Sequence, residues 1–383
     1  WGNSQVRHSR ENGNPGLDPR SRPGMTSDRT LHPVLGLPAG FVWPNFRFAF
    51  PLQLYFSFKK WKPDVIHFHT SGPMALAAII LSKILKIKLV GTFHSYLMEK
   101  EYLANQNVPP FLYGIVSSLM WRYICFVFNQ CDVVVSPSAW VAKDIRDHGI
   151  YKPIKVVHNG ADLSQFGQEV SDEVIKKLRE KYGLGENVLL YVGRLSREKG
   201  LDVLLKALKV LTSYSPARIA TQSVAGGLLL TPKLLLVGDG PADGELKKLA
   251  IDLGISKDVI FLGRVNHSDL PGSGLFEVSK AFVTASASEN QPLTIIEAMS
   301  KGLPIIGVTA RGVTELVNGN GLLALPSDET DLANKISQLL GDESARLKMG
   351  NVSRKLSQDF SLSKAAENLE SLYRNIPSSQ AGF

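Results

Sequence analysis

The chain has 383 residues, of which 44% are apolar, and its formal net charge is +8. This length suits two α/β domains or one large one, and the apolar fraction is that of a globular protein with a sizeable core. The moderate positive charge favours acidic partners such as nucleotides or an anionic membrane, but the sequence has no Lys/Arg run of the kind that binds nucleic acid.

The first part of the chain does not have the composition of a folded domain. Residues 1–27 are rich in Gly, Pro, Arg, Asn and Ser and have almost no apolar periodicity. We predict that they form a disordered leader or a segment foreign to the fold. The segment 34–50 is rich in Pro and aromatic residues, and we expect it to be irregular with one short strand.

From residue 62 onward, short apolar segments alternate with segments of helical periodicity. In the first half, strands are predicted at 65–69, 88–93, 132–135 and 154–157, and helices at 74–85, 111–128 and 140–148. After a predicted linker at 162–166, strands are predicted at 188–192, 234–237, 259–262, 281–283, 304–307 and 322–324, and helices at 174–182, 201–211, 244–253 and onward to about 374. This alternation predicts βαβ units and parallel sheets, whose ligands bind beyond the carboxyl ends of the strands.

Two stretches depart from this alternation. Residues 213–232 are longer than a usual loop and are expected to be a mobile surface insertion. The most apolar stretch, 111–128, contains Arg122 and is interrupted by Gly114 and two serines, so we expect a buried or interfacial helix rather than a membrane span. The two cysteines, Cys125 and Cys131, have no metal-binding or CxxC spacing, which indicates a reducing compartment.

A pair of glutamates dominates the segment 286–302. Glu289 and Glu297 are eight positions apart, with a plausible helix start between them. Ser288 is predicted to be the N-cap of this helix and Gln291 its capping-box partner, with Pro292 in the first turn, where its missing N–H is no loss.

Such a helix start would form an anion site. The free N–H groups of Leu293, Thr294 and Ile295 would face a phosphate, which the helix dipole also favours. Glu297 could then accept hydrogen bonds from a vicinal diol such as a ribose, and Glu289 would face the group beyond the phosphate. Acidic residues near a helix start also stabilise helices without any ligand, so the spacing alone leaves both interpretations open.

Two cations lie in another strand–helix turn of the same half. Arg194 and Lys199 follow Gly193, which allows a ligand close to the backbone, and together they could neutralise a pyrophosphate. Ordinary surface cations are the alternative for this turn taken alone. Combined with the acidic helix start, the turn favours a phosphate site.

Three histidines follow or lie in strands of the first half. His94 follows a strand and could donate to a sugar hydroxyl, although a structural role is the alternative for a single histidine. His67 and His69 share one strand face, as a pair of metal ligands would, but no third ligand stands at a telling position.

Six motifs in a fixed order are similar to those of one enzyme family. They are Pro63-Asp64-Val65-Ile66-His67-Phe68-His69, Thr92-Phe93-His94, Val157-His158-Asn159-Gly160-Ala161-Asp162, Gly193-Arg194-Leu195 with Lys199-Gly200, Leu236-Val237-Gly238-Asp239-Gly240-Pro241, and Glu289 with Glu297-Ala298-Met299 and Gly302-x-Pro304-Ile305. Together they closely resemble the retaining GT-B glycosyltransferases of family 4, and the resemblance covers residues 62–374.

The resemblance implies an α/β fold of the GT-B type, with two Rossmann-like doubly wound domains that face a cleft. The expected parts are the leader at 1–27, an N-terminal acceptor-side domain at 28–165, a C-terminal nucleotide-sugar-binding domain at 166–355, and a helix with a tail at 356–383 that crosses back to the N-terminal domain. Members of the family open with a strand and a Gly-rich loop that nothing in 1–27 resembles, so the N-terminal domain is expected to be incomplete.

The resemblance also implies the activity and the site. The expected enzyme is a retaining, metal-independent hexosyltransferase with a front-face mechanism, which uses a UDP- or GDP-sugar as substrate and needs no cofactor. Glu289 and His94 are implied as catalytic residues. The residues implied in donor binding are Gly193, Arg194 and Lys199 for the diphosphate, Glu297 for the ribose, Arg264 and Val265 near the base, and Asn290, Gln291, Leu293 and Thr294 around the donor. Pro292 departs from the family, which has Gly there.

The expected partners are a nucleotide-sugar donor, a lipid or saccharide acceptor and a peripheral membrane surface, and no nucleic acid. The expected location is cytoplasmic or peripheral at the inner face of the membrane. Two alternatives stay open: a sugar-nucleotide epimerase of the same fold, and a catalytically inactive fragment that binds nucleotide. The sugar, the base and the acceptor are not specified by the sequence.

Overall fold

The computed structural model describes residues 36–38, 47–49, 51–94, 96, 98, 103, 108–213 and 232–376. The chain forms two compact units, residues 1–50 and 51–383, which are described separately. The predicted leader at 1–27 and nearly all of the predicted insertion at 213–232 lie outside the described residues.

The described part of the first unit is a small antiparallel pair of strands. β1 (Gly36–Pro38) pairs with β2 (Arg47–Ala49), with Leu37 opposite Phe48. The prediction of one short strand in 34–50 was therefore wrong, because two strands form. Three-residue strands are too short to show the alternation on which a sequence-based assignment depends.

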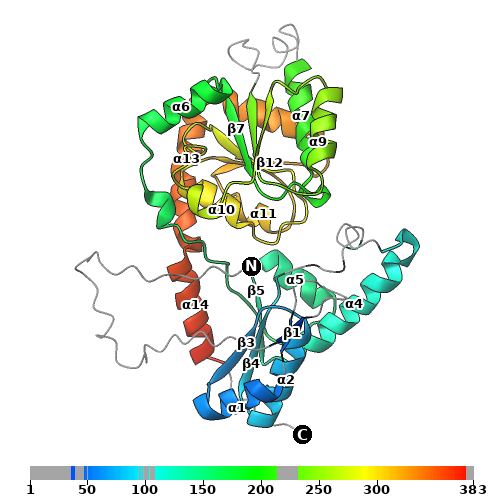
Figure 1. The fold of residues 1–383 in the computed structure, drawn as a ribbon. Helices are drawn as coiled ribbons and strands as arrows, with labels where there is room; N and C mark the ends of the chain where they lie inside the picture. The colour runs from blue at the N-terminus through cyan, green and yellow to red at the C-terminus, as the bar shows by residue number, and fades with distance from the viewer. Residues whose placement is uncertain are drawn as a thin grey trace, which may run out of the picture. The chain divides into compact units, whose positions relative to one another are not determined.

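The second unit begins with a four-stranded parallel sheet in the spatial order β3-β4-β5-β6. Its strands are β3 (Val65–Phe68), β4 (Lys88–Thr92), β5 (Val133–Ser136) and β6 (Ile154–Val156). Its helices are α1 (Pro51–Trp61), α2 (Pro73–Leu85), α4 (Tyr113–Phe128, after the 3-10 turn η2 at Pro110–Leu112) and α5 (Ala139–Asp147). All were predicted within a few residues except α1, which was missed (Figure 1).

A six-stranded parallel sheet follows, in the order β12-β11-β10-β7-β8-β9. Its strands are β7 (Val188–Val192), β8 (Lys233–Val237), β9 (Val259–Gly263), β10 (Ala281–Val283), β11 (Ile305–Val308) and β12 (Gly321–Ala324). The strand order reverses between β7 and β10. A reversal of this kind opens a crevice at the carboxyl ends of the two strands, which is where ligands of such sheets bind.

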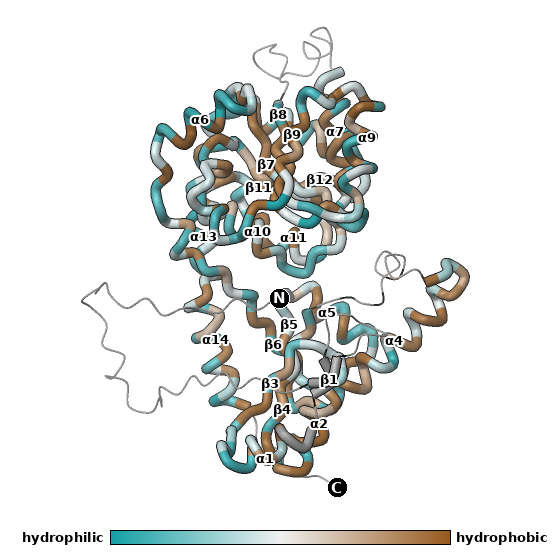
Figure 2. The backbone as a smooth tube through the Cα atoms, in the orientation of Figure 1, coloured by the Kyte–Doolittle hydropathy of each residue, from teal (hydrophilic) through white to brown (hydrophobic). Residues whose placement is uncertain are grey.

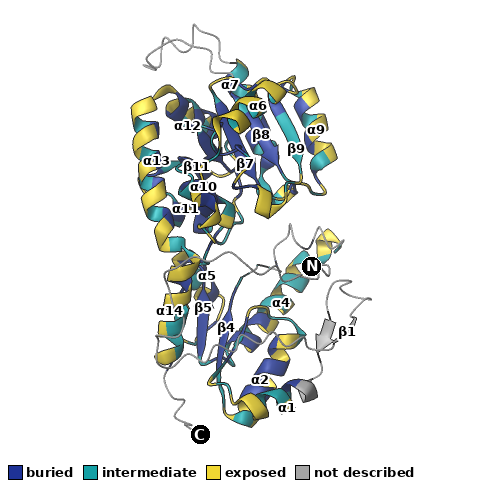
Figure 3. Ribbon diagram, turned by 60° about the vertical axis from the view of Figure 1, so that its left-hand side comes forward, coloured by how far each residue is buried: buried dark blue, intermediate teal, exposed yellow. Residues whose placement is uncertain are grey.

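Helices cover both faces of this larger sheet, because the side chains of its strands alternate between two cores. In β7, Leu189 and Tyr191 face one apolar cluster, whereas Val188, Leu190 and Val192 face the other. β7, at the centre of the sheet, is fully buried and apolar, as expected for a parallel strand covered on both faces, whereas the edge strand β9 is mostly half-buried (Figures 2 and 3). The predicted α/β fold with doubly wound parallel sheets is thus confirmed.

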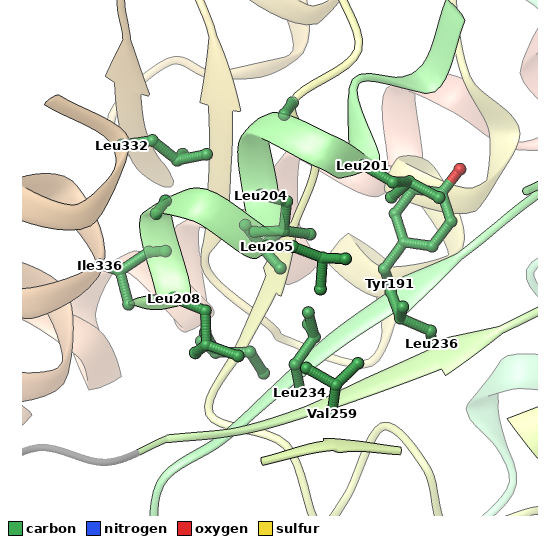
Figure 4. Packing of buried hydrophobic residues seen from close by; sticks show 14 of the residues in the cluster. Tyr191, Leu201, Leu204, Leu205, Leu208, Leu234, Leu236, Val259, Leu332 and Ile336 are labelled. Carbon is green, nitrogen blue, oxygen red and sulfur yellow. The ribbon is translucent and has the colours of Figure 1, made fainter. Parts of the chain in front are cut away.

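The first of these cores joins distant parts of the chain. Leu204, Leu205 and Leu208 of α7 (Leu201–Ser213) pack on Leu234 and Leu236 of β8, and helix α12 (Glu329–Gly341) closes the cluster with Leu332 and Ile336 (Figure 4). The remaining helices of this part are α6 (Asp172–Tyr182), α9 (Asp243–Asp252), α10 (Leu293–Ser300), α11 (Arg311–Leu316) and α13 (Glu343–Ser357).

The last helix, α14 (Leu362–Arg374), returns to the first sheet. Leu369, Leu372 and Tyr373 pack against a cluster that contains Val90, Val133 and Val135 of β4 and β5. The turn before this helix is bonded to the connection between the two sheets, since Ala161 exchanges backbone hydrogen bonds of 2.9 Å with Phe360 and Leu362.

A substitution at Gly160 tests whether the close packing at this junction stabilises the fold. A Cβ atom at Gly160 would lie 2.7 Å from the Cα of Leu362 and 2.8 Å from the Cβ of Ala365, so Gly160→Ala must displace α14. We expect a loss of about 1–3 kcal/mol in the free energy of unfolding, measured by urea denaturation, which is the usual effect of overpacking. Gly167→Ala is the matched control, because nothing lies within 4 Å of its added Cβ. Equal stability of the two variants would contradict the prediction.

Candidate active site

The residues predicted to bind the donor lie at the carboxyl ends of three strands of the larger sheet. Gly193 and Arg194 follow β7, and Lys199 lies in the 3-10 turn η4 (Arg197–Lys199). Arg264 and Val265 follow β9. The segment from Glu289 to Thr294 follows β10 and opens α10, so all of these residues share one edge of the sheet.

The backbone of this edge is tightly interlocked. Gly193 N–H donates to Val237 O at 2.9 Å, and Leu195 N–H donates to Asp239 O at 2.9 Å. Gly238 has a φ of +139°, and a Cβ atom there would lie 1.9 Å from Gly193 O. The Gly-rich turn after β8 therefore supports the Arg194 turn by close backbone approach.

A part-buried ion pair joins two of the predicted site residues. Lys199 Nζ lies 2.6 Å from Glu289 Oε1, and each side chain is 21% exposed. The hydroxyls of Ser286 and Ser288 donate to Glu198 O, which ties the β10–α10 loop to the η4 turn. The cation predicted for the diphosphate and the carboxylate predicted for the sugar are thus paired with each other.

The start of α10 differs from the prediction. Pro292 is the N-cap, with a φ of −74° and a ψ of 120°, and the helix begins at Leu293. Ser288 is not an N-cap, and the carbonyl oxygen of the Gln291 side chain accepts instead from Asn159 N–H at 2.6 Å. The predicted capping box was wrong because a residue that precedes proline is disfavoured in helical conformation, so Gln291 could not lie inside the first turn.

Although α10 begins later than predicted, its first two turns can still provide the predicted contacts with a phosphate and a ribose. Leu293 and Thr294 occupy the first turn, where N–H groups lack helical partners, and Glu297 lies in the second turn. The Glu297 side chain is 5% exposed, and burial raises its pKa, while the hydrogen bond from His267 opposes that rise. His267 Nε2 lies 2.7 Å from Glu297 Oε1. Sequence reasoning missed His267, which belongs to no motif that we recognised.

Unpaired buried polar atoms gather around this loop. Of the five described side-chain polar atoms that are buried without a hydrogen-bond partner, four belong to the β10–α10 loop, to the η4 turn or to α10: Glu198 Oε2, Asn290 Oδ1, Gln291 Nε2 and Glu297 Oε2. Buried polar atoms are normally hydrogen-bonded, so such a concentration makes this region the candidate for binding polar groups of a ligand.

The same loop contacts the part of the chain that carries the first sheet. The amide nitrogen of the Asn290 side chain donates to His94 O at 2.6 Å. Helix α11 adds a second contact, since the carboxylate of Glu315 accepts from the N–H groups of Ala139 and Trp140 at the start of α5. The Arg311 guanidinium lies 5.4 Å from the centroid of the Trp140 ring. His94, predicted to reach the donor sugar, is therefore connected through its backbone to the loop of Glu289.

The three histidines form a stacked row at the end of the first sheet. His69 Nδ1 lies 3.0 Å from His94 Nε2, and the rings of His67 and His69 stack with centroids 4.3 Å apart. His67 is also hydrogen-bonded to Thr92 and to Tyr373 of α14, each at 2.6 Å. Within the described part of the chain, no group of three or more His, Cys, Asp or Glu side chains is arranged to hold a metal ion.

Two of the predicted residues make few contacts. The side chains of Arg194 and Arg264 are exposed at the strand ends, where they are accessible to a ligand. The backbone of Arg194 is fixed, because Tyr191 Oη donates to its carbonyl oxygen at 3.0 Å. Glu289, Glu297 and Lys199 therefore form the ordered centre of the site, and the two arginines lie at its accessible rim.

Two sequence models of known families match adjacent parts of the chain. The family described as Glycosyl transferases group 1 matches residues 174–356, and Glycosyltransferase Family 4 matches residues 13–165. The chain belongs to the group 1 glycosyltransferases of the GT-B fold. The predicted family is thereby confirmed.

Relatives and solved structures of this glycosyltransferase family agree with that assignment. The chain is 27% identical to sulfoquinovosyl transferase SQD2 of Arabidopsis thaliana, over 79% of this chain and 54% of the relative. It is 28% identical to alpha-monoglucosyldiacylglycerol synthase of Streptococcus pneumoniae, over 74% of this chain and 60% of the relative. The chain thus spans less than two thirds of these two relatives.

The fold also matches that of the Anabaena protein Alr3699/HepE. The structure of that protein in complex with UDP-glucose is 25% identical, with a TM-score of 0.66 over 88% of this chain and 84% of the other. Its complex with UDP and glucose has a TM-score of 0.67 at 23% identity, over 85% of this chain and 81% of the other. The GT-B glycosyltransferase fold implied by the sequence is confirmed.

The histidine row predicts how the free energy of unfolding of this chain depends on pH. Burial, together with His69 and His94, lowers the pKa of His67 from 6.5 to about 3. The folded state therefore binds fewer protons than the unfolded state, so the stabilisation is complete above pH 6.5 and is lost as the pH falls toward 3. We expect the free energy of unfolding to fall below pH 6.5, by up to about 1.4 kcal/mol per pH unit for this imidazole.

Urea denaturation between pH 7 and pH 4.5 measures this dependence. His67→Gln removes the titrating group and should flatten the pH dependence relative to the unmodified chain. His158→Gln, at another half-buried histidine outside the row, serves as the control. Parallel curves for the unmodified chain and His67→Gln would contradict the prediction.

Proposed function

We propose that this glycosyltransferase transfers a hexose from a UDP-sugar to a lipid or saccharide acceptor with retention at the anomeric carbon and without a metal ion. The observation that carries the proposal is the group of unpaired buried polar atoms around the Lys199–Glu289 ion pair at the start of α10. The solved complex of Alr3699/HepE with UDP-glucose supports the choice of UDP.

Donor binding would use charges that the site already holds. A diphosphate at the start of α10 would meet Lys199, the accessible Arg194 and the first-turn N–H groups of Leu293 and Thr294, all of which favour negative charge. When Lys199 neutralises the diphosphate, the Glu289 carboxylate becomes available to accept hydroxyl groups of the donor sugar. The ion pair seen here would thus be exchanged for two contacts with the donor.

The other half of the nucleotide would follow the same edge of the sheet. The free oxygen of Glu297 would accept a ribose hydroxyl. Arg264 and Val265, which follow β9, would lie beside the base. Asn290 and Gln291 each use one side-chain atom to hold the loop against the part of the chain that carries His94, and their unpaired atoms, Asn290 Oδ1 and Gln291 Nε2, would face the donor.

The transfer itself would proceed on one face of the sugar. The bond between the anomeric carbon and the diphosphate oxygen breaks, the acceptor oxygen forms a bond to that carbon from the same side, and the acceptor proton passes to the departing phosphate. Lys199, Arg194 and the N–H groups of α10 would stabilise the charge on the leaving UDP. Burial and His69 lower the pKa of His94, so its imidazole is neutral near pH 7 and would act as a hydrogen-bonding group at the sugar.

Nucleotide binding and donor cleavage test this proposal separately. In EDTA, we expect UDP and UDP-glucose to raise the melting temperature. The corresponding increase in the free energy of unfolding is about 2.7 kcal/mol at a ligand concentration 100 times the dissociation constant, and GDP should have no effect. Glu289→Gln should retain UDP binding and lose about 100-fold in the rate of transfer or hydrolysis of the donor. Glu245→Gln, an exposed carboxylate paired with Arg197, is the control.

Three results would contradict the proposal. They are a requirement for a divalent metal, undiminished turnover in Glu289→Gln, and conversion of UDP-glucose into an epimer by the protein alone, observed by NMR. The last of these would support the epimerase.

The acceptor side has a feature that favours a membrane. Among the described residues one helical stretch, Pro110–Phe128, is long and apolar enough to cross a membrane, and 17% of its most apolar 18-residue window is buried within the fold. Length and composition alone do not identify a span, since core helices of soluble proteins also meet these criteria. Much of this helix is apolar in Figure 2 and exposed or half-exposed in Figure 3.

The exposed apolar side chains lie on one side of the helix. Phe111, Ile115 and Leu119 recur every four residues and are 81%, 60% and 58% exposed, and Phe126 continues the row. Arg122 lies between Leu119 and Phe126, and α4 contains no acidic residue. We propose that this apolar row enters the headgroup region of an anionic membrane, where Arg122 meets lipid phosphates and the acceptor is a lipid. The protein would then be peripheral at a membrane surface.

Vesicle co-sedimentation tests this surface. We expect the protein to bind vesicles that contain phosphatidylglycerol, and the triple variant Phe111→Ser, Ile115→Ser, Leu119→Ser to bind about tenfold or more weakly, because apolar area no longer enters the bilayer. Leu347→Ser, at an exposed leucine of α13, is the control. Unchanged binding by the triple variant would contradict the proposal and leave a soluble saccharide acceptor.

A further inference from the structure

None of the functions proposed above uses the contact between His267 and Glu297. His267 comes from the 3-10 turn η5 (His267–Asp269) after β9, and Glu297 comes from the second turn of α10. The two side chains differ sharply in burial, since His267 is 62% exposed and Glu297 is 5% exposed. An exposed side chain therefore reaches inward to a carboxylate that is otherwise enclosed.

The two oxygens of this carboxylate have different surroundings. Oε1 lies 2.7 Å from His267 Nε2, whereas Oε2 is buried and has no hydrogen-bond partner among the described residues. A buried carboxylate oxygen without a partner is unfavourable, and a hydrogen-bond donor supplied by a ligand would remove that cost. One oxygen is thus held by the protein and the other is available to a ligand.

The imidazole is itself held in place. Asn266 precedes the η5 turn and makes two hydrogen bonds with Asp269. Its side-chain nitrogen donates to Asp269 Oδ2 at 3.2 Å, and its backbone carbonyl oxygen accepts from Asp269 N–H at 2.9 Å. The His267 ring lies 6.0 Å from the ring of Phe166, which is buried. The turn and the aromatic neighbour lie on either side of the hydrogen bond to Glu297, so His267 Nε2 faces the carboxylate in the absence of any ligand.

We propose that His267 is a positioning residue, which donates from Nε2 to Glu297 Oε1 and so aims Oε2 at the hydroxyl groups of the ribose. This inference rests on the proposed binding of a UDP-sugar. A carboxylate with one oxygen fixed cannot rotate about its terminal bond, so the geometry required to accept the diol is prepared in advance. His267 acts through Glu297 and does not touch the nucleotide.

The prediction concerns the ribose hydroxyls specifically. A ribonucleotide offers two hydroxyl donors to Glu297, whereas a 2′,3′-dideoxynucleotide offers none. If His267 aims the carboxylate, its loss should weaken only the binding of a nucleotide that has these hydroxyls. If His267 merely supports the η5 turn, its loss should weaken both nucleotides equally.

Isothermal titration calorimetry with UDP and 2′,3′-dideoxy-UDP, in EDTA, distinguishes these two roles of His267. The unmodified protein should prefer UDP, and His267→Ala should lose about tenfold in UDP affinity with little change for the dideoxy nucleotide. His267→Gln should restore the preference, because its amide nitrogen can occupy the place of Nε2, and His267→Asn should not. Ser268→Ala, on the same turn and exposed, is the control.

A double variant completes the test. Glu297→Gln should lose the preference for UDP, and His267→Ala combined with Glu297→Gln should lose nothing further, because the two residues act as one unit. Unchanged preference in His267→Ala, or equal weakening of both nucleotides, overturns the inference while the proposed function stands. Failure of the unmodified protein to bind UDP at all overturns the proposed function, and this inference with it.

Discussion

The ion pair between Lys199 and Glu289 is the interaction on which the arrangement of the site depends. Both groups are largely withdrawn from water, and removing charges from water is costly unless each finds a partner in good geometry. Without its partner, either charge would be left uncompensated in a half-buried place. Pairing makes both charges tolerable at this depth, and under the proposed function a phosphate and a sugar hydroxyl would replace the two partners, which would explain why a cation and a carboxylate that follow different strands converge there.

The loop that carries Glu289 is held from several directions, and small residues make this possible. Gly312 N–H donates to Glu289 O at 3.1 Å, and a Cβ atom at Gly312 would lie 1.7 Å from Asn290 O, so only glycine allows α11 to approach the loop so closely. The same helix caps α5 through Glu315, at a helix start that favours negative charge. The carboxylate predicted for the sugar is thus fixed by backbone packing as well as by charge.

Much of the fold follows from the sequence because parallel strands buried on both faces are continuous apolar runs. Val188–Val192 was predicted to the residue, since every side chain in it is buried. The incorrect or missing predictions arise where a local effect opposed the sequence pattern or the pattern was too short. The capping box at Ser288 matched a pattern, but Pro292 prevents the preceding residue from entering the helix. Three-residue strands and α1, next to a segment of irregular composition, gave too little periodicity to recognise.

In the candidate site, too, the sequence located some residues and missed another. Glu289, Glu297, Lys199 and Arg194 stand in motifs whose spacing within strand–helix turns places them at one edge of a sheet, so the sequence could locate them. His267 could not be located, because its partner is 30 positions away and the contact depends on how η5 folds beside α10. Long-range contacts of single side chains leave no periodic trace in a sequence. The candidate ligand-binding residues, which stand in motifs, are therefore easier to find from a sequence than a residue such as His267, which contacts one of them from another turn.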